Sequence, residues 1–473
     1  MVFSSHIFLF YFLPLALLAY YATPRGGKAL VLTLASYVFY GWWNPWFTLL
    51  MLASTAVDYA CGKAICAAGA SPGQRKAGMI TSVAVNLSIL GFYKYAGFFA
   101  GNASTLAEML GWGAVQAPAF IYQIVLPVGI SFYTFQSMSY SIDLYRGHAR
   151  PAPSFLDFAC YVSLFPQLVA GPIVRYGSVA EQLHHRVHTS QGFALGIARF
   201  SLGFAKKILL ANPMGAAADS CFAAGDGVLT APLAWLGACA YAFQIYFDFS
   251  AYSDMAIGLG RMLGFRFPEN FDSPYKSASI TEFWRRWHIS LSSFLRDYLY
   301  IPLGGNRKGT ARTYANLMIV MLLGGLWHGA QWNYLAWGAI HGTMLAAERM
   351  MGKSAFYGRL PHALKVAATF GILLITWVYF RAENMDAASR YILAMFGQGG
   401  GAPESAILAA QVLRPANLFY FVLCGGIAFF APRSVAMMEN LTGRRAAMLV
   451  GGLAVAVAVM FTQGFNPFLY FQF

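Results

Sequence analysis

A histidine in an otherwise apolar segment is the residue of this sequence whose type and surroundings most clearly suggest chemistry. His328 follows the nearly all-apolar run 317–327, which predicts that it lies within a membrane or at its edge. An ionisable side chain is costly there, and histidine can stay neutral and still exchange a proton near pH 7. His328 is therefore a candidate general base. The alternative is a packed core histidine whose hydrogen bonds are satisfied by its neighbours.

Glycine pairs spaced four residues apart accompany the histidines of this region. Gly325 and Gly329 bracket Trp327 and His328, and a second pair brackets His341. Small residues at this spacing allow helices to approach closely, or they leave room for a substrate. We expect His341 to have a packing or supporting role.

A second candidate, His288, follows a pair of arginines. Two guanidinium groups would attract an anion, and a phosphate-bearing donor or lipid headgroups would both suit them. His288 lies 40 residues before His328 (328 − 288), enough for one helix to leave and another to return. The candidates for holding a donor are these arginines and nearby tryptophans, namely Arg285, Arg286, Trp287 and Trp327.

Residues 266–312 are polar but do not read as an ordinary loop. Thr281 and the residues after it open a helix, with Ser279 or Thr281 as its cap. From Phe283 to Tyr298, aromatic residues alternate with charged ones. The pattern predicts a helix with one aromatic and one charged side, which lies in the membrane interface or lines a polar cavity.

Acidic residues and prolines within the apolar segments indicate a cavity. Asp248 and Asp254 suit a polar wall in a membrane cavity, and a proton relay of a transporter is the rival interpretation. Pro127 and Pro172 are expected to break or kink their spans. Non-helical backbone at membrane depth is tolerated only where protein or water surrounds it.

The composition places these segments in a membrane. Of 473 residues, 58% are hydrophobic and only 11% are charged, whereas soluble domains carry about 25% charged residues. The net charge of +14 fits basic cytoplasmic loops, and no basic run alternates with aromatics as nucleic-acid binding would require. The six cysteines include no Cys-x-x-Cys pair, and no His-x-x-x-His accompanies a carboxylate. We therefore expect no disulfide framework and no metal site.

Apolar stretches approaching the length of a span, about 20 residues, recur along the chain, and roughly ten to twelve should cross the membrane. Loop charges place residues 23–28 and 67–77 inside and residues 101–120 outside. No Lys or Arg precedes the first apolar run, so we expect a retained first span rather than a cleaved signal peptide. The candidate spans are 6–22, 29–44, 46–66, 78–100, 121–142, 155–174, 191–215, 230–262, 313–330, 331–350, 364–380, 416–431 and 446–463.

Five segments are long and specific enough to identify a family. They are LPVGISFYTFQSMSYSIDLYRG (126–147), FPQLVAGPIVRY (165–176), FDFSAYSDMAIGLGRMLGF (247–265), FWRRWHISLSSFLRDYLYIPLGG (283–305) and LWHGAQWNYLAWGAIHG (326–342). These segments resemble the membrane-bound O-acyltransferase (MBOAT) family, most closely its bacterial alginate O-acetylation (AlgI-like) branch. The resemblance implies one all-α, polytopic integral membrane domain over residues 1–473, with a ring of about 11 spans around a thinned centre.

The same resemblance implies a function. The chain would be a multi-pass O-acetyltransferase of the bacterial inner membrane, and the family's two histidines match His328 and His288. The donor would be cytoplasmic acetyl-CoA, with no metal. The acetyl group would pass to a periplasmic or cell-surface SGNH-hydrolase-like partner, which acetylates an exopolysaccharide such as alginate. The other partner is membrane lipid, and no nucleic acid is implied.

Two alternatives of other classes stay open. A secondary transporter would use Asp248, Asp254 and the broken helices as a proton-coupled path. A non-catalytic membrane subunit of a polysaccharide synthase complex would use the histidines for packing alone.

Overall fold

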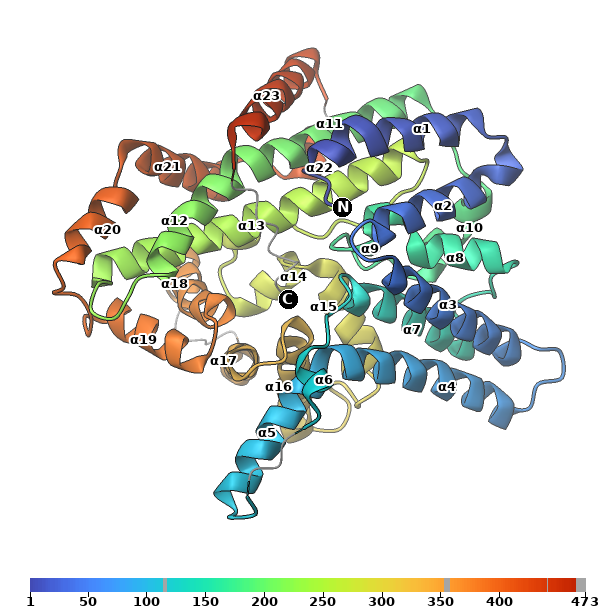
Figure 1. Cartoon of the computed structure of the whole chain (residues 1–473), viewed down its shortest axis with the longest axis horizontal. Coiled ribbons are helices and arrows are strands. Elements are labelled where there is room, and N and C mark those ends of the chain that lie inside the picture. Colours follow the sequence, from blue (N-terminus) through green and yellow to red (C-terminus); the bar gives the residue numbers. More distant parts are fainter. Residues whose placement is uncertain (114–116, 353–357, 440, 465–473) are drawn as a thin grey trace. The chain divides into compact units, whose positions relative to one another are not determined.

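The computed structural model describes residues 1–113, 117–352, 358–439 and 441–464. Every regular element in these residues is a helix (Figure 1). The all-α prediction is therefore confirmed for the described part of the chain. Part of the predicted outside loop, residues 114–116, lies outside the described residues.

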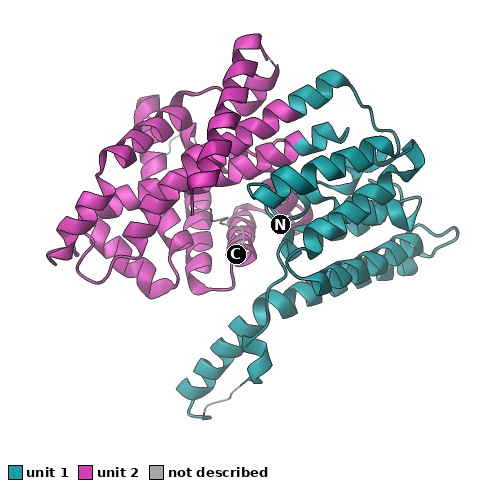
Figure 2. Cartoon of the chain, turned by 45° about the horizontal axis from the view of Figure 1, so that its top comes forward, with its two compact units in different colours: residues 1–196, 259–267 teal, residues 197–258, 268–473 magenta. Residues whose placement is uncertain are grey.

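The described chain divides into two compact units (Figure 2). The first comprises residues 1–196 and 259–267, and the second comprises residues 197–258 and 268–473. The helices within the first unit are η1 (Phe8–Phe12), α1 (Leu13–Ala22), η2 (Arg25–Gly27), α2 (Lys28–Gly41), α3 (Pro45–Ile65), α4 (Pro72–Leu90), η3 (Gly91–Tyr95), α5 (Ala96–Met109), α6 (Ala119–Tyr122), α7 (Ile130–Arg146), α8 (Phe155–Ser163), α9 (Phe165–Leu168) and α10 (Tyr176–His184).

Buried polar side chains tie three helices of the first unit together. Asp58 of α3 is fully buried, and its carboxylate accepts hydrogen bonds from Ser82 (2.6 Å) and Asn86 (2.8 Å) of α4. The Ser82 hydroxyl also lies 2.7 Å from that of Ser141 on α7. Buried polar groups are costly unless they are hydrogen-bonded, so this network fixes how these helices pack.

Both predicted proline breaks are confirmed. The predicted span 121–142 is helical without interruption only from Ile130, because residues 123–129 are not helical. Gly129 has φ 76°, and a Cβ there would lie 2.7 Å from the Leu168 carbonyl oxygen. Around Pro172 the chain is likewise non-helical, over residues 169–175.

The second unit contains the candidate site. Two helices, α11 (Ser190–Lys206) and α13 (Ala231–Met262), contain two of the three boundaries between the units, and the third lies between residues 267 and 268. The remaining helices are η4 (Lys207–Ala211), α12 (Asn212–Phe222), η5 (Pro274–Lys276), α14 (Ile280–Arg286), α15 (Ile289–Leu295), η6 (Arg296–Tyr300), α16 (Thr310–His328), α17 (Trp332–Met351), α18 (His362–Arg381), α19 (Met385–Met395), α20 (Glu404–Val412), α21 (Pro415–Phe430), α22 (Ser434–Glu439) and α23 (Gly443–Thr462).

The glycine pairs bring α16 and α17 into close contact. A Cβ on Gly325 would collide with the carbonyl oxygen of Tyr334, and one on Gly338 with that of Met321. A Cβ on Gly329 would collide with the Tyr334 ring. Of the two interpretations of these glycines, close backbone approach is therefore the one confirmed at these positions.

Residues 280–300 do not form the one predicted helix. Ser279 caps α14, since its side chain accepts a hydrogen bond from the Glu282 N–H (3.0 Å), as predicted. The chain then becomes extended at Trp287, and His288 adopts the left-handed conformation with φ 45°. The prediction of a continuous helix is wrong because periodicity does not detect a single left-handed residue.

Few helices qualify as spans by length and composition alone. Three do so among the described residues: Pro72–Met109, His362–Arg381 and Gly443–Thr462. A fourth is obtained if Glu404–Val412 and Pro415–Phe430, bent by 54°, count as one span. The larger span count therefore stays a prediction.

Candidate active site

His328 is the last residue of α16 and lines a cavity of about 510 Å³. Its side chain is buried, and aromatic rings surround it. The centroid distances from its imidazole are 4.9 Å to Trp327, 5.4 Å to Trp337 and 5.0 Å to Phe380. The imidazole is therefore held by rigid neighbours and also reaches an open space.

Three arginines line the same cavity, namely Arg285, Arg296 and Arg349. The Arg296 guanidinium is paired with Asp297 at 2.7 and 3.1 Å. For the other two, no ion pair with a carboxylate is found among the described residues. The cavity therefore carries an excess of positive charge, which suits a phosphate-bearing ligand.

The neighbouring arginine, Arg286, is used differently. Its guanidinium pairs with Glu282 at 2.7 Å, one helical turn away, and donates to the Asp272 carbonyl at 3.3 Å. It is not among the residues that line the cavity. Trp287 is buried in the hydrophobic core, with its ring 5.1 Å from that of Trp377. Of the predicted donor-binding residues, the structure brings Arg285 to the cavity but places these two elsewhere.

His288 is fully buried between α14 and α15, outside the predicted spans. Burial lowers the pKa of its imidazole to about 3. Its Nδ1 lies 3.3 Å from the side-chain oxygen of Asn270, which also accepts hydrogen bonds from the backbone N–H and hydroxyl of Ser290. Nδ1 is therefore the donor, and Nε2 has no hydrogen-bond partner among the described residues.

Trp327 connects the two histidines. Its ring centroid lies 6.0 Å from that of His288 and 4.9 Å from that of His328. Residues far apart in the sequence thus contact one indole, although His288 is not among the residues that line the cavity.

His341 lies behind the cavity wall. Its ring centroid is 4.9 Å from that of Trp337, and its Nδ1 accepts a hydrogen bond from Trp284 Nε1 at 3.3 Å. Trp337 itself lines the cavity, and its buried Nε1 has no hydrogen-bond partner among the described residues. Sequence reasoning did not single out Trp337. The sequence did contain a usable signal, because Trp337 and His341 are four residues apart and therefore lie on the same face of a helix.

Glu348 is a second residue that sequence reasoning missed. Its carboxylate accepts hydrogen bonds from the backbone N–H groups of Ile280 (2.7 Å) and Thr281 (2.8 Å). The negative charge sits at the start of α14, where it complements the helix dipole. Glu348 thereby fixes the short helix that presents Arg285.

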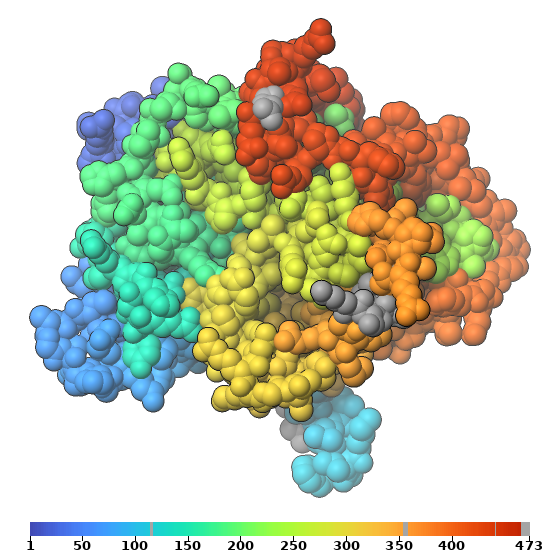
Figure 3. Space-filling model, turned by 180° about the vertical axis from the view of Figure 1, so that it is seen from behind, coloured from blue at the N-terminus to red at the C-terminus, as the bar shows by residue number. Residues whose placement is uncertain are grey.

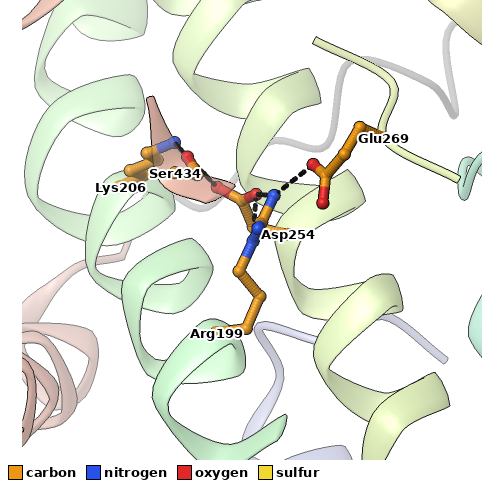
Figure 4. Close-up of polar contacts among 5 residues, drawn as sticks. All are labelled: Arg199, Lys206, Asp254, Glu269 and Ser434. Carbon is orange, nitrogen blue, oxygen red and sulfur yellow. Dashed lines mark hydrogen bonds and ion pairs between the residues drawn. The ribbon is translucent and has the colours of Figure 1, made fainter. Parts of the chain in front are cut away.

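The acidic residues of α13 are paired with cations that sequence reasoning did not consider. Asp248 forms an ion pair with Lys207 at 2.8 Å. Asp254 pairs with Arg199 at 2.6 Å and with Lys206 at 2.7 Å (Figure 4). Asp254 lines a second cavity, as predicted for a polar wall, and Asp248 is not among its lining residues.

In the described part of the chain, no three His, Cys, Asp or Glu side chains lie close enough to hold a metal ion. The polar groups that line the His328 cavity include its own imidazole, the indole of Trp337 and the guanidinium groups of three arginines.

Comparison with known proteins identifies the family of the chain. The profile of the MBOAT, membrane-bound O-acyltransferase family matches residues 146–380, a range that includes both histidines. The chain belongs to this family, so it is a membrane-bound acyltransferase.

Named relatives narrow the class further. The probable alginate O-acetylase AlgI of Azotobacter vinelandii is 44% identical over the full length of both chains. A protein of the same name from Pseudomonas aeruginosa is 51% identical over 84% of this chain and 75% of its own. The peptidoglycan O-acetyltransferase of Helicobacter pylori is 35% identical over 85% of this chain and 80% of its own.

Proposed function

We propose that this protein takes an acetyl group from cytoplasmic acetyl-CoA and passes it across the inner membrane for O-acetylation of a polysaccharide such as alginate. The observation that carries the proposal is one cavity that brings together His328 and two arginines for which the described part of the chain offers no carboxylate partner. The names of the relatives, alginate O-acetylase and peptidoglycan O-acetyltransferase, support an acetyl group and an extracytoplasmic polymer.

His328 acts as the general base in this proposal. A hydroxyl is a weak nucleophile at neutral pH, so a base must remove its proton as it attacks the thioester carbonyl. The imidazole takes that proton and returns it to the departing thiolate of coenzyme A, so the products are an acetyl ester and a free thiol. His328 lies at the C-terminus of α16, where the helix dipole stabilises positive charge.

The negative charge that develops on the carbonyl oxygen needs hydrogen-bond donors. The Nε1–H of Trp337 is buried, lacks a partner among the described residues and belongs to a residue that lines the cavity. We assign it to the oxyanion. His288, which is neutral, positions Trp327 and the donor from the far side of that indole.

Arg285 and Arg349 hold the phosphates of coenzyme A, because guanidinium groups bind phosphate with paired hydrogen bonds. Arg286 is already satisfied by Glu282 and Asp272, so its role is to secure α14. The acceptor hydroxyl belongs to a periplasmic or cell-surface SGNH-hydrolase-like partner, which completes transfer to the polymer. The protein is a single membrane domain, and more of its helices cross the membrane than the three or four of the described chain that qualify by length and composition.

The test replaces His328 with Gln and measures transfer of labelled acetyl from acetyl-CoA to the partner, using purified protein. We expect transfer to fall to background while the protein remains monodisperse in detergent. The matched control is His185→Gln, because His185 is exposed in a polar loop. Wild-type transfer by the His328 variant would refute the assignment. Substrate export without any acetylated product would favour a transporter, and absence of both activities in the wild type would favour a non-catalytic subunit.

A further inference from the structure

The second unit contains another cavity, of about 650 Å³, that shares no lining residue with the His328 cavity. Its walls come from α11, α13 and the C-terminal helices α21 to α23. In the space-filling view, the red side chains of those last helices lie against the green and yellow-green side chains of the earlier ones (Figure 3).

One wall of this cavity is ionic. The Arg199 guanidinium lies between the carboxylates of Asp254 and Glu269, at 2.6 Å from each (Figure 4). The Lys206 ammonium donates hydrogen bonds to Asp254 (2.7 Å) and to the Ser434 hydroxyl (2.9 Å). These contacts join α11, α13 and α22, so the wall is built from fixed side chains.

Positive charge exceeds negative charge around the cavity. Four cationic residues line it, including Arg433 and Arg445, against two carboxylates. A third carboxylate, Asp272, lies 3.7 Å from the Arg433 guanidinium, which is itself 60% exposed. Lys276 adds a further cation, because its ammonium donates to the carbonyl of the lining residue Ala431.

The rest of the cavity is apolar and belongs to helices that suit a lipid environment. Its apolar walls include Leu202, Leu209, Ile427 and Met448. α23 is long and apolar enough to cross a membrane, and its outer side chains are exposed. Arg445 lies in the first turn of this helix, where a charged residue at the end of an apolar helix reaches the level of lipid headgroups.

We propose that this cavity is a binding site for one anionic phospholipid. The phosphate lies against Arg433 and Arg445, and an acyl chain lies along the apolar walls. A soluble phosphate would use only the ionic wall and would leave the apolar part of the cavity without an occupant. The site is independent of the acyl transfer proposed for His328.

Two neighbouring glycines allow the space to be tested. A Cβ on Gly452 would have only one contact within 4 Å, with Ala205 at 3.9 Å, and Gly452 lines the cavity. A Cβ on Gly451 would meet nothing within 4 Å, and Gly451 is not a lining residue. Gly452→Leu therefore fills the cavity, and Gly451→Leu is its matched control.

The experiment uses native mass spectrometry of the full-length protein, delipidated in a neutral detergent. Phosphatidylglycerol and phosphatidylcholine with the same acyl chains are titrated separately, and sn-glycerol 3-phosphate is added as a soluble competitor. We expect phosphatidylglycerol to bind at least about tenfold more tightly than phosphatidylcholine, with about a fivefold loss for each of Arg433→Gln and Arg445→Gln. The charge control is Arg390→Gln, because Arg390 is an exposed residue of α19 that is 61% accessible.

Gly452→Leu should abolish retention of the tight lipid, whereas Gly451→Leu should bind as the wild type does. Three results would overturn the proposal. They are equal affinity for the two lipids, wild-type binding by Gly452→Leu, and displacement of phosphatidylglycerol by glycerol phosphate at equal concentration. Thermal unfolding of each variant is measured as well, so that a folding defect is recognised. Arg433→Gln is the variant least expected to disturb packing, because the Arg433 side chain is 60% exposed.

Discussion

Two adjacent arginines provide a sharp test of how the donor is bound. Arg285 lines the His328 cavity without a carboxylate partner among the described residues, whereas Arg286 is paired with Glu282 and is not a lining residue. We therefore predict that Arg285→Gln raises the KM for acetyl-CoA and that Arg286→Gln leaves it almost unchanged. The two variants lose the same charge at neighbouring positions, so each controls for the other.

The expected rise in KM follows from the hydrogen bond that Arg285 makes to a charged phosphate of the donor. A hydrogen bond to a charged group contributes about 1.5–3 kcal/mol. Arg285 is exposed, so solvent screening favours the lower end of that range. About 1.4 kcal/mol corresponds to a tenfold change, so we expect KM to rise about tenfold. Phosphates far from the reacting carbon are bound equally in the ground and transition states, so kcat should stay within about twofold of the wild type.

The assay measures initial rates of labelled acetyl transfer over a range of acetyl-CoA concentrations, at low and at high salt. Adding Arg349→Gln to Arg285→Gln should raise KM further, because both guanidinium groups line the cavity. Equal effects of Arg285→Gln and Arg286→Gln would refute the assignment. So would a fall in kcat at unchanged KM, which would place Arg285 at the reacting atoms.

Four further predictions concern single side chains. Trp337→Phe replaces the indole with a smaller aromatic ring that has no N–H, and single-turnover rates should fall about 100-fold, as for the loss of one oxyanion donor. Gly338→Ala collides with the Met321 carbonyl and should lower the Tm, whereas Gly371→Ala, which meets nothing within 4 Å, should not. The pKa of His288 is about 3 in the folded protein and about 6.5 when unfolded, so the wild type loses stability as the pH falls between these values. His288→Gln should lose less of its Tm over that window. Arg199→Gln removes the cation that Asp254 and Glu269 share and leaves Asp254 with Lys206 alone, so it should cost less than the roughly 3–5 kcal/mol of a fully unpaired buried charge, measured as a fall in Tm.

Helical class and helix breaks could be predicted because both depend on local properties. A composition so poor in charge favours membrane helices, and Pro127 and Pro172 lack the N–H that a continuous helix needs. The number of spans could not be settled in the same way. Residues such as Gln136 and Ser137 of α7 are fully buried in protein, so a helix that carries them has low hydropathy whatever its position.

The candidate site was predictable only in part. His328 and Arg285 were identified because ionisable residues are rare beside apolar runs. The different roles of Arg285 and Arg286 were not predictable, because they depend on Glu282, on the Asp272 carbonyl and on the break of the helix at His288.

Cations within the apolar segments were also missed. Arg199 is buried in a predicted span, and its partners Asp254 and Glu269 lie on segments distant in the sequence. Pairing at such separation depends on tertiary packing, which spacing along the chain does not report. A cation inside a predicted span was nevertheless a usable signal, because charge there requires a partner or a ligand.

The central claim is that His328 is the base in the transfer of an acetyl group from one face of the membrane to the other. The most direct test uses proteoliposomes with labelled acetyl-CoA outside and the partner with its polysaccharide acceptor inside. The account predicts labelled acceptor inside the vesicles with the wild-type protein and none with His328→Gln. Label inside at the wild-type rate with His328→Gln, or transfer only when acetyl-CoA and acceptor share one face, would contradict it.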